Sequence, residues 1–307
     1  MKKNVKIGIN YILEIPIEIY KILKKYGYLE LIKFPGAKCT NEELEKFIEA
    51  AKELDVYVDI HGLPNMVPEL HNRNFIDNVK WDEINKELFE LKNSNYFSTH
   101  IGYNNNIVKE KIFDELNEKE VKQILINNVE NIRKKFKEKF NKEMNIGGEM
   151  QAGGYNLDLR MLEPQFINKM WSEMDFGVID ITHIKLALKE LKIDYNEYLD
   201  KLENREKVKI CHLSGIGDRL DKDSHTLLSI NEIEEVEKVL DIFNNIDTVI
   251  SEYCFKYKYS RQKEMCIIMI CLNRFIKHNE KIDKLYKFLE KELNEDCSNL
   301  EEIILNI

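Results

Sequence analysis

Short apolar segments alternate with longer amphipathic segments along the chain. The apolar segments are only a few residues long and rich in Val, Ile, Leu and Phe, as buried strands are. The segments between them repeat their apolar residues with a helical period, most clearly over 118–140. The pattern predicts strands at 5–10, 29–34, 56–60, 96–99, 145–148, 176–179, 208–213 and 248–251. It predicts helices from Pro16 to near Gly27, from Asn41, and at about 81–92, 118–140, 163–174, 184–191, 195–202, 230–243, 262–278 and 280–293.

Strands that alternate with helices favour a parallel sheet, because each helix returns the chain to the start of the next strand. Eight such units with short connections predict an α/β fold of the (β/α)8 TIM-barrel type, in which no strand edge stays exposed. No Pro- or Gly-rich linker divides the sequence. We therefore expect 1–307 to form a single barrel domain that C-terminal helices close.

Histidines and acidic residues recur where the predicted strands end. The active sites of such barrels lie at the C-terminal ends of the strands, so these side chains should converge on one mouth. Imidazole and carboxylate groups are ligands for zinc, iron and manganese. Their number exceeds what one ion needs and predicts two or three ions, with Glu149 and Glu252 as bridging carboxylates. The candidate ligands are His61, His100, Glu149, Asp180, His183, His212, Asp223, His225 and Glu252.

Composition narrows the class of protein. The net charge of −9 gives no overall basic surface for a nucleic acid. The six cysteines form no CxxC pair, which indicates reduced thiols and a cytoplasmic protein. Apolar segments are too short for a membrane span, so no membrane association is expected.

Several strings resemble the xylose-isomerase-like barrel superfamily, which includes endonuclease IV and sugar isomerases. They are His61-Gly-Leu, Ser98-Thr-His100, His212-Leu-Ser-Gly215 and Asp223-Ser-His225-Thr. Within it, the chain looks most like the multinuclear non-heme iron-dependent oxidative enzymes. That resemblance implies two or three irons and the use of dioxygen to modify a ribosomally made peptide, often at cysteine. It implies that a partner protein presents the peptide. The iron ligands it implies are His61, His100, Glu149, Asp180, His212, Asp223, His225 and Glu252.

Two positions depart from that family. His183 stands where it usually has Asn, and Asp-x-x-His is the form of endonuclease IV and the isomerases, which take zinc or manganese. Lys33-Phe-Pro-Gly36 replaces its Glu-Asn pair after the second strand.

Three functions therefore stay open at this point. The first is the iron-dependent peptide oxidase. The second is a zinc phosphodiesterase, for which the loop 255–261 alternates aromatic and basic residues that could meet bases and phosphates. The third is a metal-dependent sugar isomerase or epimerase, in which Glu149 and Glu252 would exchange a proton with the substrate.

Overall fold

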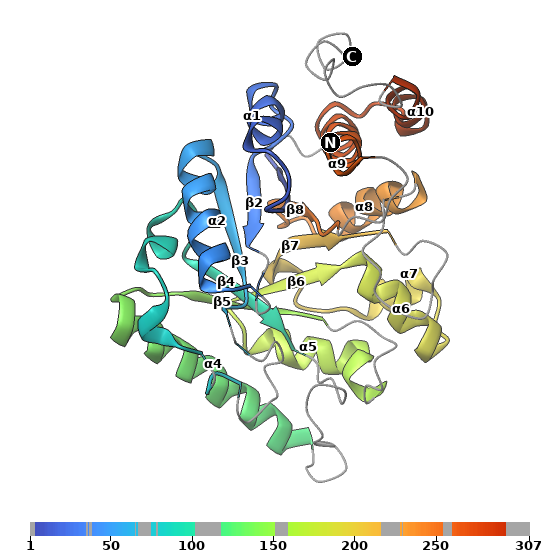
Figure 1. Ribbon diagram of the computed structural model, residues 1–307. Helices are drawn as coiled ribbons and strands as arrows, with labels where there is room; N and C mark the ends of the chain where they lie inside the picture. The colour runs from blue at the N-terminus through green and yellow to red at the C-terminus, as the bar shows by residue number, and fades with distance from the viewer. Residues whose placement is uncertain are drawn as a thin grey trace.

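Eight parallel strands close into a barrel in chain order, and the last strand pairs with the first (Figure 1). This confirms the predicted TIM-barrel fold. The computed structural model describes residues 4–34, 36, 39–64, 66, 75–77, 79–101, 118–150, 159–215, 228, 230–253 and 260–292. The strands are β1 (Lys6–Asn10), β2 (Leu31–Phe34), β3 (Tyr57–His61), β4 (Tyr96–His100), β5 (Asn145–Glu149), β6 (Phe176–Asp180), β7 (Val208–Leu213) and β8 (Thr248–Ser251).

Helices surround the strands in the order that the sequence pattern predicts (Figure 1). The C-terminal helix α9 packs against β1 and α1, and α10 packs against α9 and α8. The α-helices are α1 (Ile17–Lys25), α2 (Asn41–Leu54), α4 (Glu118–Phe140), α5 (Pro164–Ser172), α6 (Ile181–Leu191), α7 (Tyr195–Lys201), α8 (Ile230–Ile242), α9 (Arg261–His278) and α10 (Ile282–Glu292). The short 3-10 helices include η4 (Leu159–Leu162) and η5 (Arg205–Lys207).

The helix expected at about 81–92 is wrong. The structure has two 3-10 helices there, η2 (Trp81–Glu83) and η3 (Lys86–Glu90). Asn85 lies between them, and its side chain accepts a hydrogen bond from the backbone N–H of Glu87, which starts a new turn. The rings of Trp81 and Phe89 still pack on Phe136 of α4, so tertiary contact overrides the local helical pattern.

Four strands run one residue further than the sequence pattern indicates. β3, β4, β5 and β6 therefore end on His61, His100, Glu149 and Asp180. The strand ladders place His100 beside Glu149 and Asp180 beside His212. The candidate ligands thus belong to the rigid sheet, and strand register sets their relative positions.

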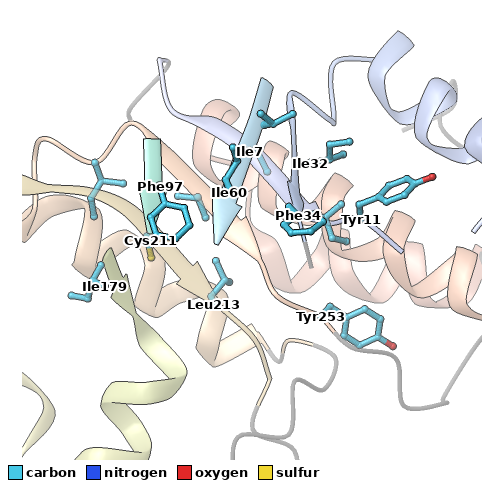
Figure 2. Packing of buried hydrophobic residues seen from close by; sticks show 14 of the residues in the cluster. Ile7, Tyr11, Ile32, Phe34, Ile60, Phe97, Ile179, Cys211, Leu213 and Tyr253 are labelled. Carbon is cyan, nitrogen blue, oxygen red and sulfur yellow. The ribbon is translucent and has the colours of Figure 1, made fainter. Parts of the chain in front are cut away.

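Side-chain alternation along the strands divides the core in two. One set packs between strands and helices, and includes Ile32, Phe34, Ile179 and Cys211 (Figure 2). A separate, smaller apolar cluster consists of Leu31, Phe176, Val178, Ile210 and Ile250. Because side chains on one face of a strand recur every second residue, the residues two places further on lie above this cluster at the C-terminal end of the barrel. They are Lys33, Asp180, His212 and Glu252.

No helix in the described ranges is both long and apolar enough to cross a bilayer. Cys39, Cys211, Cys266 and Cys271 are buried and form no disulfide. Cys211 lies in the outer core, on the side of β7 away from His212, as strand alternation predicts.

Because Gly148 has no side chain, it leaves room for the side chain of Ile101, which directly follows β4. A Cβ atom at Gly148 would lie 2.3 Å from Cγ2 of Ile101, next to His100. The Gly148 carbonyl also accepts a hydrogen bond from the Trp171 indole N–H at 2.9 Å. We expect Gly148→Ala to lower the free energy of unfolding by about 1–3 kcal/mol through overpacking, measured by urea denaturation. Combined with Ile101→Ala, it should cost less than the sum of the two changes. A Gly148→Ala variant as stable as wild type would contradict this account.

Candidate metal centre

Acidic and imidazole side chains gather at the C-terminal end of the barrel. Among the described residues, three overlapping groups bring their ligand atoms within 4.8 Å of one another. Glu149 belongs to every one of these groups. The groups are His61 with Glu149 and His212; His100 with Glu149 and His183; and Glu149 with Asp180, His212 and Glu252.

Glu149 is the centre of the arrangement. Its Oε1 lies 3.1 Å from Nδ1 of His212 and 3.4 Å from Nδ1 of His183. Its Oε2 lies 3.2 Å from Nε2 of His61 and 3.6 Å from Nε2 of His100. Each carboxylate oxygen therefore faces two imidazoles, as the oxygens of a bridging carboxylate would.

Two residues of this centre have buried polar atoms without a hydrogen-bond partner among the described residues. Glu149 and His212 are fully buried. Within the described part of the chain, both oxygens of Glu149 and both ring nitrogens of His212 have no hydrogen bond of normal geometry. Such burial is costly unless a cation or a proton compensates it. The donor set therefore fits a divalent ion on chemical grounds.

The charges of the centre also suit a cation. Burial alone would raise the pKa of Glu149, but the facing imidazoles, His212 before His61 and His100, hold that pKa well below its usual value. Burial, and next the positive charge of Lys33, lower the pKa of His61 well below its usual value. The direction of each shift favours the form that binds a metal, which is the ionised carboxylate for Glu149 and the neutral imidazole for His61.

Outer contacts orient two of the histidines. Nδ1 of His61 lies 2.9 Å from Oγ of Ser98, which leaves Nε2 toward Glu149. His183 lies in the first turn of α6, and its Nδ1 is 2.7 Å from the carbonyl oxygen of Met150. A histidine with one ring nitrogen held in this way presents the other nitrogen to a metal. For His183 that nitrogen is Nε2, which lies 4.0 Å from Oδ2 of Asp180.

Asp180 and Glu252 are the other two acidic residues in these ligand groups. Oδ1 of Asp180 accepts a hydrogen bond from the backbone N–H of His183 at 2.8 Å, so this residue also caps α6. That cap explains why α6 begins at Ile181 and not at the expected 184. Oε1 of Glu252 lies 3.0 Å from Nδ1 of His212.

The structure thus brings together seven of the nine predicted site residues: His61, His100, Glu149, Asp180, His183, His212 and Glu252. Asp223 and His225 lie outside the described residues, as does most of the loop 255–261.

Two buried residues of the centre were not among the sequence candidates. Oδ2 of Asp59 lies 4.0 Å from Nε2 of His212, and Lys33 forms an ion pair with Oε1 of Glu252. Asp59 precedes His61 by two residues on β3, so strand alternation offered a signal for it. Lys33 interrupts the apolar strand β2 with a charge, which is the same kind of signal.

We expect Asp59→Asn to weaken metal binding by about tenfold or more. A carboxylate behind a ligating histidine orients the ring and raises its basicity, and its loss typically costs that much. The measurement is competition against a chelating dye. Asp55→Asn is the matched control, because Asp55 is an exposed helix cap with positive φ that Asn also adopts. Equal weakening in both variants would contradict the role of Asp59.

Comparison with known proteins identifies the fold but no closer family. No protein-family model matches the sequence, and neither does any curated protein sequence. Solved structures of sugar epimerases share the barrel. A 3-keto-D-glucoside 4-epimerase from E. coli superposes with a TM-score of 0.58 at 12% identity, over 87% of this chain and 100% of that one.

Two further structures agree with this result. A D-tagatose 3-epimerase-like protein gives a TM-score of 0.58 at 15% identity, over 89% of this chain and 100% of that one. A D-psicose 3-epimerase from Clostridium cellulolyticum H10 gives 0.53 at 10% identity, over 94% and 98%. The chain therefore shares the TIM-barrel fold of these proteins.

Proposed function

We propose that this protein is a metal-dependent sugar isomerase or epimerase. The observation that carries the proposal is the buried group of Glu149, Asp180, His212 and Glu252 at the barrel mouth. It combines ligands for one ion with two glutamates, Glu149 and Glu252, at the ends of separate strands. The shared fold with structures of 3-keto-D-glucoside 4-epimerase and D-psicose 3-epimerase supports the same class.

The chemistry needs two acid–base groups on either side of a substrate carbon. An ion held by these residues would act as a Lewis acid toward a hydroxy-carbonyl substrate. Glu149, ionised because its pKa is held low, can take a proton from the carbon beside the carbonyl. Glu252, which directly follows β8, can pass a proton taken from solvent to that carbon from another side, which inverts its configuration, and the proton on Glu149 then returns to solvent. Strands β6 and β7 lie between β5 and β8 in the barrel, so the two carboxylates approach from different directions.

Proton exchange with solvent tests this proposal directly. Metal-loaded protein is incubated with ketohexoses in D2O, with Mn²⁺, Zn²⁺ and anaerobic Fe²⁺ as separate conditions. We expect deuterium at the carbon beside the carbonyl and formation of an epimer or an aldose, detected by NMR. A metal-loaded protein that exchanges no proton with any of these sugars would contradict the proposal.

A second candidate is metal-dependent hydrolysis of a phosphodiester. The observation that favours it is the presence of His61, His100 and His183 around the same Glu149, because these exceed the ligands of one ion. Clustered ions can activate water and stabilise a leaving oxygen. Cleavage of bis(p-nitrophenyl) phosphate and of abasic DNA by zinc-loaded protein tests this candidate.

The iron-dependent oxidation of a peptide stays a prediction. None of the epimerase structures described above supports it, although a centre with this many ligands is compatible with two or three irons. The peptide substrate and its presenting partner protein likewise stay predictions. Elemental analysis of anaerobically purified protein separates iron from zinc and manganese.

A further inference from the structure

Lys33 is a buried cation inside the proposed metal centre. Its side chain is 6% exposed and lies on β2, between the apolar residues Ile32 and Phe34. A lysine is almost never buried without a partner, because the ammonium group loses its hydration. The position two residues after Leu31 places Lys33 on the barrel-interior face of β2, at the level of the metal ligands.

The partner of Lys33 is a proposed metal ligand. Its ammonium group forms an ion pair with Oε1 of Glu252, whose side chain is 7% exposed. The same oxygen lies 3.0 Å from Nδ1 of His212. The oxygen that Glu252 would offer to an ion beside His212 is thus already in contact with a positive charge.

Lys33 also lies next to an acidic residue of the neighbouring strand. Lys33 is the register partner of Asp59 on β3. Lys33 therefore lies beside two buried carboxylates of the centre, Asp59 and Glu252, whose charge a divalent ion would otherwise neutralise.

We propose that Lys33 is a built-in cation of the centre, which neutralises Glu252 when no ion is bound there and competes with a metal ion for that carboxylate. The inference rests on the proposed metal centre but not on the reaction that it catalyses. Two positive charges a few ångströms apart repel each other strongly at low effective dielectric. Lys33 therefore weakens metal binding at Glu252 and stabilises the metal-free barrel.

Replacement of the charge at constant shape tests this role. Lys33→Met keeps the buried aliphatic stem and removes the ammonium group. We expect the variant to bind Mn²⁺ or Zn²⁺ about tenfold or more tightly than wild type, measured by competition with a chelating dye. In the metal-free state its melting temperature should fall by about 5 °C or more, because Glu252 stays buried without its cation. Lys33→Arg, which keeps the charge, should restore the weaker binding.

The matched control is Lys277→Met. Lys277 pairs with Glu30, which directly precedes the same strand β2 at the other end of the barrel. We expect this variant to leave metal affinity at the wild-type value. Metal binding by Lys33→Met that equals or is weaker than wild type would overturn the inference while leaving the centre intact. A wild-type protein that binds no divalent ion would overturn the centre itself and this inference with it.

Discussion

Glu149→Gln is expected to reduce the bound divalent ions to at most one per chain and to lower turnover about 10³-fold or more. The reason is that this carboxylate contributes an oxygen to every ligand group found among the described residues. The amide keeps the size of the side chain but loses the charge and one ligand oxygen. Elemental analysis gives the ion count, and deuterium exchange from D2O into the sugar gives the turnover.

Glu30→Gln is the control for this variant. Glu30 is also a paired glutamate, bound to Lys277 and to the backbone N–H of Ile7, but it lies at the other end of the barrel. It should keep the wild-type ion count and turnover. A Glu149→Gln protein that keeps two or more ions would show that Glu149 is not a bridging ligand.

A second variant, Glu252→Gln, separates the role of Glu252 as a ligand from that of Glu149. Glu252→Gln should lose the ion at the group with Asp180 but keep binding at the group of His100, Glu149 and His183, because Glu252 belongs only to the group with Asp180 among those found in the described residues. The ion count of Glu252→Gln should therefore lie between those of wild type and Glu149→Gln.

Much of this centre could be predicted from sequence because a barrel converts strand order into proximity. A residue that ends a buried strand in a (β/α)8 fold reaches the same rim as the other strand ends, whatever the distance in sequence. His61, His100, Glu149 and Asp180 each end a strand. Seven candidates consequently lie at one site although they span 61–252 in the sequence.

Strand order could not predict which side chains of the centre contact one another. The ion pair between Lys33 and Glu252 depends on side-chain reach across β1, which separates β2 from β8. The approach of Asp59 to His212 likewise joins strands on different sides of the barrel. The η2 and η3 turns show the same limit, because the packing of Trp81 and Phe89 on Phe136 decides the local backbone.

Metal binding itself should stabilise the folded chain by a large amount. The centre exists only in the folded protein, so an ion that binds it favours folding by about 4 kcal/mol at a free concentration one thousand times its Kd. For a chain of this size that corresponds to a rise in melting temperature of about 6 °C. The metal-free state is less stable, since Glu149 and His212 are buried facing one another without ordinary hydrogen bonds within the described residues.

The measurement is thermal unfolding of chelator-stripped protein with and without added Mn²⁺, Zn²⁺ or anaerobic Fe²⁺. Glu149→Gln should lose most of the rise and Glu30→Gln should keep it. A melting temperature that no divalent ion changes would contradict a metal centre at this rim, because these buried groups would then have to be balanced by protons and by Lys33 alone.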